Sequence, residues 1–191
     1  MKKNFIILFL ITLIPINAFA LIEVDITRGN LNPLPLAVSP LSIDDKSKKS
    51  FEKILKKENI GSEISTIVEN NLRTSGLFNP LSKEAFLQAP DIANLKPRFE
   101  DWNLIKAQAL ITGKVTYVDE KLRVEFRLWD VLAAKEMMAL AFTTVPSNWR
   151  RVGHIISDKV YERLTGEKGY FDTRIIYVAE EGPKTQRKKR L

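Results

Sequence analysis

The chain has 191 residues, among them no cysteine and one histidine, and a formal net charge of +7. This composition excludes a disulfide framework, cysteine nucleophiles and the Cys/His clusters of zinc sites. Two basic residues lie at the extreme amino terminus and five in the last eight positions, so residues 21–183 carry 23 basic and 23 acidic side chains. Because a nucleic-acid binder is expected to spread its excess charge over a folded face, this neutral body argues against that function.

The first twenty residues have the plan of an export signal. A positively charged start precedes an apolar run over residues 5–14, and residues 18–20 form a small-x-small cleavage site. The apolar run is too short to cross ~30 Å of hydrocarbon as a helix, which argues against the alternative of a retained anchor. We expect cleavage after Ala20, a periplasmic location, and a mature chain that starts at Leu21 and has no integral membrane span.

The mature start alternates apolar and polar side chains, which is typical of a half-exposed strand. The strand is predicted to consist of Leu21, Ile22, Glu23, Val24, Asp25, Ile26 and Thr27. Gly29 and Asn30 interrupt it, and a second short apolar run follows at Leu36-Ala37-Val38. The Lys-rich stretch from Asp44 to Glu58 predicts a short, marginal, exposed helix whose strong apolar anchors are Phe51, Ile54 and Leu55.

A better helix is predicted beyond residues 59–61, with Ser62 as its N-cap and Gly76 closing it in the left-handed conformation. Residues 77–81 then form a short extended piece. A further short helix over residues 98–106 places Phe99, Trp102 and Ile105 on one side.

The strongest pattern lies in the second half of the chain, where Leu122, Val124, Phe126 and Leu128 alternate with charged residues. With residues 109–118 before it and 137–145 after it, this strand predicts an antiparallel meander. Gly113 indicates a bulge or the close approach of a helix. The last helix buries Val152, Ile156, Val160 and Leu164 and closes at Gly166. The fold class is therefore α/β (α+β), a mixed sheet with an antiparallel meander covered by helices on one face.

Residues suited to catalysis are scarce. His154 is the only imidazole, and as a lone residue on the last helix it is interpreted as a structural hydrogen-bonding group. The adjacent pairs Asp44-Asp45 and Glu180-Glu181 lie in polar stretches typical of solvated surface. With no glycine-rich phosphate loop, the sequence predicts no catalytic residue, no metal site and no cofactor.

One long segment carries a family resemblance. The segment from Trp149 to Val178 is similar to the signature of the TolB family of the Tol-Pal system, and the residues concerned are Trp149-Arg150-Arg151, His154, Ile156, Asp158, Tyr161-Glu162, Leu164-Thr165-Gly166, Gly169-Tyr170-Phe171-Asp172-Thr173-Arg174-Ile175 and Tyr177-Val178. Supporting stretches are Leu72-Arg73, Ser75 to Pro80, Leu128-Trp129-Asp130 and Arg28-Gly29.

The resemblance implies a domain plan. Residues 1–20 would be the signal peptide, 21–168 an amino-terminal α/β domain like the anticodon-binding fold of some tRNA synthetases, and 169–191 a linker and the start of a missing β-propeller. The segment from Arg174 to Val178 would be a blade strand without its blade. We therefore expect residues after about 172 to be disordered.

The resemblance also implies a function in the cell envelope. Family members are periplasmic protein-binding components that support outer-membrane integrity, outer-membrane invagination during cell division, and bacteriocin and protein import. The mature amino terminus, Leu21 to Thr27, would bind TolA by adding a strand to its sheet edge, whereas the missing propeller makes binding to Pal doubtful. For the strand, the alternative is that it completes the domain's own sheet. For the chain, the alternatives are a non-catalytic envelope module with an unrelated partner and a basic-tailed nucleic-acid-binding domain. An envelope enzyme is a weaker alternative.

Overall fold

A mixed six-stranded sheet forms the centre of the computed structural model, which describes residues 32–174, 178–183 and 187–190. The predicted export signal and the predicted strand from Leu21 to Thr27 lie outside the described residues. The elements are, in chain order, β1 (Leu34–Val38), β2 (Ser42–Ile43), α2 (Asp45–Leu55), α3 (Ile60–Thr74), β3 (Phe78–Pro80), η1 (Lys83–Ala85), α4 (Pro90–Leu95), α5 (Phe99–Leu104), β4 (Ala109–Val118), β5 (Lys121–Asp130), β6 (Lys135–Thr144), η2 (Pro146–Asn148), α6 (Trp149–Thr165), β7 (Ala179–Glu181) and β8 (Lys188–Arg190).

The sheet combines parallel pairing on one side with an antiparallel meander on the other. Its strand order is β3-β1-β4-β5-β6, with β1 parallel to both of its neighbours. Where β1 ends, β2 takes its place beside β4. The β4–β5 and β5–β6 pairs are antiparallel, which confirms the predicted meander. Its third strand begins at Lys135, two residues before the predicted start.

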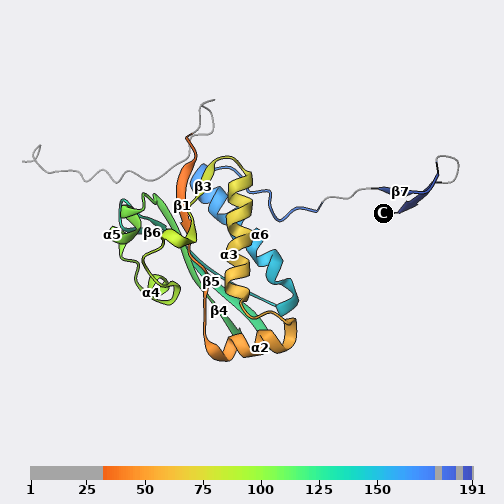
Figure 1. Cartoon of the computed structure of the whole chain (residues 1–191), viewed down its shortest axis with the longest axis horizontal. Coiled ribbons are helices and arrows are strands. Elements are labelled where there is room, and N and C mark those ends of the chain that lie inside the picture. Colours follow the sequence, from red (N-terminus) through yellow and green to blue (C-terminus); the bar gives the residue numbers. More distant parts are fainter. Residues whose placement is uncertain (1–31, 175–177, 184–186, 191) are drawn as a thin grey trace, which may run out of the picture.

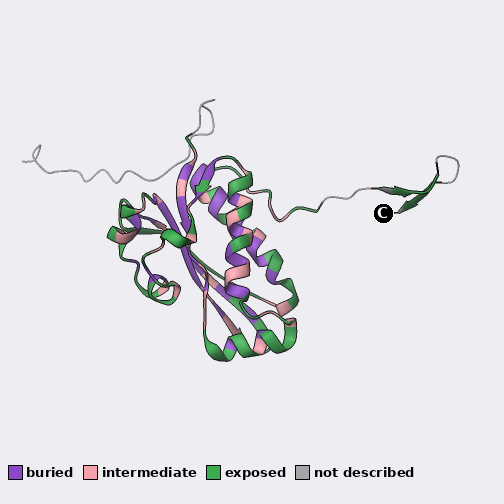
Figure 2. Cartoon of the chain, viewed as in Figure 1, coloured by how far each residue is buried: buried purple, intermediate pink, exposed green. Residues whose placement is uncertain are grey.

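Helices α3 and α6 lie side by side over one face of the sheet, and α2 lies across one end (Figure 1). The main core lies between these helices and the sheet (Figure 2). Burying side chains of this size stabilises the fold by roughly 1.5–3 kcal/mol each, and α6 contributes all four residues of its predicted stripe. The largest fully buried aliphatic and aromatic members of this core are Leu36, Phe51, Ile60, Ile64, Leu72, Ile111, Leu122, Phe126, Leu128 and Ile156.

A second, smaller core lies on the opposite face, so helical cover is not confined to the one face that was predicted. It comprises Ala37, Ala93, Trp102, Ala107, Leu110 and Val131. The buried amide of Gln88 organises the chain there, because its Oε1 accepts hydrogen bonds from Trp102 Nε1 and from the Arg98 backbone N–H, both at 3.0 Å. One polar side chain thus holds α5 against the segment before α4.

Three details of the predicted helices and strands were wrong. The N-cap of α3 is Asn59 rather than Ser62, because Ile60 is fully buried and the helix starts there to carry it inward. Gly113 does not form a bulge, since it pairs in regular register with Phe126. Among the described residues, the atoms nearest to a side chain at residue 113 belong to no helix. The Glu125 carbonyl and the Leu41 side chain occupy the space that such a side chain would need. The register shift of the meander lies instead between Leu128 and Trp129.

The Lys-rich stretch forms α2 as predicted, but with one dominant anchor. Phe51 is fully buried and meets Tyr117 edge to face at a centroid distance of 5.4 Å, whereas the Ile54 side chain is 47% exposed. Gly76 and Gly166 have φ values of +75° and +76°, which confirms the left-handed helix ends. No helix in the described part of the chain is long and apolar enough to cross a membrane.

Candidate functional site

The described chain begins at residue 32, just before β1, and residues 28–31 separate it from the predicted partner-binding strand. Leu34 N donates a hydrogen bond to the Leu77 carbonyl at 2.9 Å, and Pro33 before it has no N–H to donate. Neighbouring strands occupy both sides of β1. A strand formed by the residues before β1 therefore cannot pair with β1, because β1 already pairs with β3 and β4.

Three strands of the described sheet pair on one side only, namely β3, β6 and the two-residue strand β2. The short strand β3 includes Pro80, whereas β6 has ten residues, of which those from Met137 to Thr144 carry no charge. Arg163 Nε donates to the Met137 carbonyl at 3.3 Å, close to the start of β6. A long neutral edge strand is a template for pairing with another strand. Alternation in the sequence predicts this strand but does not show that it lies at an edge.

The family-like residues on α6 clamp the chain where it leaves the domain. The Asp158 carboxylate accepts hydrogen bonds from the backbone N–H groups of Phe171 at 2.6 Å and Asp172 at 3.1 Å. Gly169 lies so close to Asp158 that a side chain at residue 169 would meet its Cα, Cβ and Oδ1 atoms. Arg151 forms an exposed ion pair with Asp172 at 3.1 Å. These contacts fix the direction in which residues after 172 depart.

An aromatic cluster completes this clamp. Tyr161 makes edge-to-face contacts with Phe78, Tyr170 and Phe171, at centroid distances of 6.1, 5.5 and 5.8 Å. Burial raises the pKa of the Tyr161 phenol, and the neighbouring Tyr170 and Glu167 raise it further. The signature residues thus join β3, α6 and the exit segment.

His154 lies in a polar contact between the two main helices. Asn71 Nδ2, on α3, is 2.9 Å from His154 Nδ1 and donates to Ser157 Oγ at 3.0 Å, and Ser157 Oγ donates to the Gly153 carbonyl. The interpretation of His154 as a structural hydrogen-bonding group agrees with this position. Asn71 thus links α3 to α6 through its contacts with His154 and Ser157.

The two acidic pairs of the sequence have separate surroundings. Asp44 is the N-cap of α2 and accepts from Ser47 N and Ser47 Oγ, each at 2.9 Å. The hydrogen bond from the Ser47 backbone N–H is the largest influence and holds the pKa of the Asp44 carboxyl below its usual value. In the hairpin formed by β7 and β8, Glu180 forms ion pairs with Arg187 at 2.7 Å and Lys189 at 3.3 Å.

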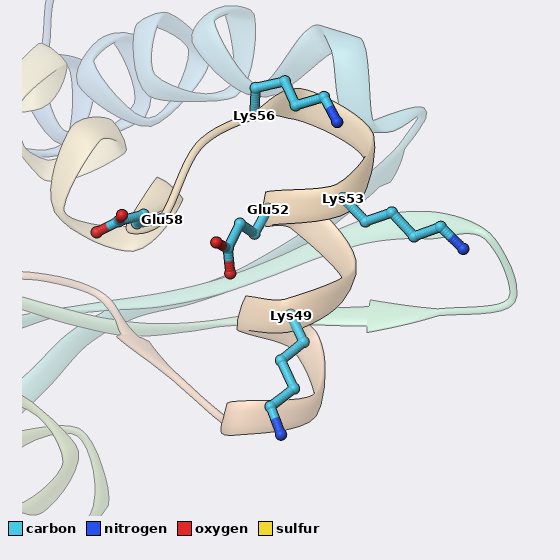
Figure 3. A pocket seen from close by; sticks show the side chains of 5 residues that line it. All are labelled: Lys49, Glu52, Lys53, Lys56 and Glu58. Atoms are coloured by element: carbon cyan, nitrogen blue, oxygen red, sulfur yellow. The ribbon is translucent and has the colours of Figure 1, made fainter.

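The outer surface of α2 is strongly charged. Lys49, Glu52, Lys53, Lys56 and Glu58 line an open depression on it (Figure 3). Lys53 and Lys56 project to one side, whereas Glu52 and Glu58 lie on the other. The opposite signs around this depression do not suit an isolated small anion or cation.

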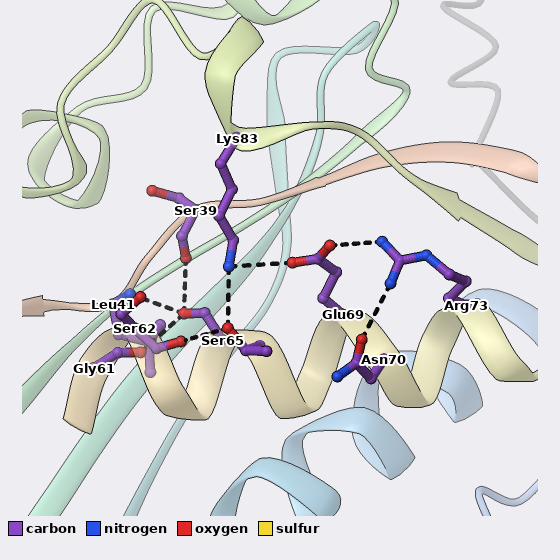
Figure 4. A network of polar contacts seen from close by, with 10 residues as sticks. Ser39, Leu41, Gly61, Ser62, Ser65, Glu69, Asn70, Arg73 and Lys83 are labelled. Atoms are coloured by element: carbon purple, nitrogen blue, oxygen red, sulfur yellow. Dashed lines mark hydrogen bonds and ion pairs between the residues drawn. The ribbon is translucent and has the colours of Figure 1, made fainter. Parts of the chain in front are cut away.

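A polar network joins α3 to the connection between β1 and β2 and to η1 (Figure 4). The buried Ser65 hydroxyl accepts from Leu41 N at 2.9 Å and lies 3.1 Å from the Ser39 carbonyl. Farther along α3, Glu69 forms ion pairs with Arg73 at 2.6 Å and Lys83 at 3.2 Å. Partial burial raises the pKa of the Glu69 carboxyl, but hydrogen bonds from both cations outweigh this effect and leave the pKa below its usual value.

Comparison with known proteins identifies the family. The sequence profile of the TolB amino-terminal domain matches residues 22–137. The chain belongs to this family. It is 85% identical over 185 residues to the Tol-Pal system protein TolB of Pelagibacter ubique, an alignment that covers 97% of this chain and 41% of that protein. Among solved structures it resembles TolB from Acinetobacter baumannii, with a TM-score of 0.61, 25% identity, and coverage of 76% of this chain and 32% of that one.

This membership of the TolB amino-terminal domain family confirms the resemblance recognised from the residues of α6 and its exit segment. The chain spans less than half the length of the Pelagibacter relative. The predicted partner-binding residues, Leu21 to Thr27, lie almost wholly within the matched range, but outside the described structure.

Proposed function

We propose that this chain supplies the amino-terminal part of a periplasmic, protein-binding component of the Tol-Pal system and has no catalytic role. The observation that carries the proposal is the 85% identity to a Tol-Pal system protein over nearly the whole chain. Residues 21–168 would form the domain and 169–191 the linker that follows it. Through this system the chain would support outer-membrane integrity, invagination during division and bacteriocin import.

Within this proposal, the strand from Leu21 to Thr27 binds TolA by pairing with an exposed edge of its sheet. Two features of the described chain support this assignment. Both sides of β1 are occupied, and Pro33 cannot donate to a ladder that extends from Leu34. The alternative, in which the strand completes this domain's own sheet, requires it to pair with β2, β3 or β6, the strands whose second side is open in the described sheet.

A deletion of residues 21–30 from the processed chain tests the assignment. We expect the deletion to abolish TolA binding in calorimetry and to leave the thermal unfolding midpoint unchanged. A Val24→Pro variant should also lose binding, because proline removes a ladder donor, whereas Glu23→Gln should retain it. Unchanged affinity after the deletion would refute the assignment, and a lowered unfolding midpoint would indicate that the strand belongs to the domain's own sheet.

A nucleic-acid-binding role is the less favoured candidate. Its main support is the basic tail, but Arg187 and Lys189 are already paired with Glu180. Salt-dependent binding of the processed chain to RNA would support a nucleic-acid-binding role.

A further inference from the structure

Four lysines form a stripe on and directly after α2. Lys46, Lys49, Lys53 and Lys56 follow one another at spacings of three, four and three residues, which places them along one side of a helix over about 15 Å. All four are exposed, and within residues 32–174 none of them has an ion-pair partner. We call these four residues the lysine stripe.

The lysine stripe does not serve the fold. Like charges three and four residues apart repel and destabilise a helix. The helix is held instead by the buried Phe51 and by its Asp44 cap. Glu52 lies between these lysines on α2, but no ion pair within residues 32–174 joins it to them, so the lysine stripe is available to an anionic partner outside the molecule.

Aliphatic side chains gather at the same end of the molecule. Ile54 on α2 is 47% exposed, Val118 at the end of β4 is 50% exposed, and Val145 after β6 is 51% exposed. The end of β4 lies against α2, because Tyr117 N donates to Ser47 Oγ at 2.8 Å. The η2 turn that follows Val145 also lies beside α2. Figure 1 shows α2 across this end of the sheet.

The combination of cations and aliphatic groups identifies the partner's chemistry. The three aliphatic residues come from three separate elements at this end of the molecule, an arrangement that suits a broad partner surface rather than a single bound peptide. Lysine ammonium groups are point charges that suit phosphate arrays and lack the bidentate geometry of arginine. Acidic residues limit the attraction to a moderate strength: Glu52 and Glu58 lie beside the lysine stripe, and Asp119 and Glu120 lie at the β4–β5 turn.

We propose that this end of the domain docks onto an anionic phospholipid bilayer, with the lysine stripe at the headgroup phosphates and Ile54, Val118 and Val145 at the interface. This docking involves a different part of the chain from the strand proposed to bind TolA, Leu21 to Thr27. Each lysine near an anionic bilayer contributes roughly a fivefold increase in affinity.

Sedimentation of the chain that starts at Leu21 with phosphatidylglycerol-containing vesicles tests the proposal. We expect binding that weakens as salt is added, and little binding to vesicles of phosphatidylcholine alone. The double variant Lys49→Gln and Lys53→Gln should bind about 25-fold more weakly, from two lysine contributions. The matched control, Lys106→Gln and Lys168→Gln, removes the same charge from exposed lysines outside α2 and should change binding less than about twofold, because these residues would not contact the bilayer.

The outcomes separate this proposal from its rivals. An equal loss in both double variants would overturn it, because net charge rather than the lysine stripe would then govern binding. Binding to soluble polyglutamate without binding to the vesicles would also overturn it, in favour of an acidic protein. An Ile54→Ser variant should weaken vesicle binding severalfold at high salt, where the aliphatic contact contributes a larger share. Unchanged thermal unfolding of the lysine variants would show that lost binding is not lost folding.

Discussion

Replacing Asp158 by alanine should release the exit segment from α6 without unfolding the domain. The carboxylate receives two hydrogen bonds, from Phe171 N and Asp172 N, and no other side chain in the described part of the chain is recorded as an acceptor for these two donors. Hydrogen bonds to a charged group contribute about 1.5–3 kcal/mol each. Because the site is half-buried and water can replace part of the loss, we expect a local cost of about 2–4 kcal/mol for the pair.

Amide hydrogen exchange measures this local opening directly. A cost of about 2–4 kcal/mol corresponds to exchange of the Phe171 and Asp172 amides that is roughly thirtyfold to a thousandfold faster, while amides of the meander keep their protection. An Asp172→Asn variant is the control, since it weakens the exposed pair with Arg151 and should accelerate exchange less than about fivefold. Equal exchange rates in the wild-type protein and the Asp158→Ala variant would refute the clamp.

Two further predictions concern carboxylates on α2 and α3. Asp44→Ala removes the N-cap of α2 and should lower the free energy of unfolding by about 1 kcal/mol in urea titration at neutral pH, whereas Asp45→Ala should have a smaller effect. Glu69→Gln should lower stability by up to about 1 kcal/mol at pH 7. Because the pKa of Glu69 in the folded protein lies below the usual value for a glutamate, the stabilisation is complete above that usual pKa and is lost as the pH falls through the folded pKa. The stability difference between wild type and Glu69→Gln should therefore shrink in acid, and a constant difference from pH 7 to acid would contradict this reasoning.

Local periodicity was sufficient to predict the elements with a strong pattern. The alternation from Leu122 to Leu128 and the stripe from Val152 to Leu164 each identify a buried face, because burial selects side chains at the period of the backbone. The glycines that end α3 and α6 were equally predictable, since few other residues adopt a positive φ without strain. The meander followed from short connections between such strands.

The periodicity of apolar residues could not predict which distant segments pair with one another. The alignment of Leu34 with Phe78, and of Leu36 with Ala109, places β1 inside the sheet, although its own sequence shows only a short apolar run. Tertiary packing also buries Ile60 at the start of α3, which makes Asn59 rather than Ser62 the N-cap, and it puts the Glu125 carbonyl and Leu41 against Gly113, where a bulge was expected.

Some features of the candidate surfaces followed from the sequence, and others depended on the tertiary structure. The amino-acid sequence alone determined the alternating apolar and polar pattern from Leu21 to Thr27, the family-like residues of α6, and the spacing of the lysines on α2. The tertiary structure decided that β6 is an open edge and that Val118 and Val145 lie at the same end of the molecule as α2. The physical reason is that a side-chain pattern records which face of an element is buried, whereas the neighbours of that element depend on contacts between residues far apart in the chain.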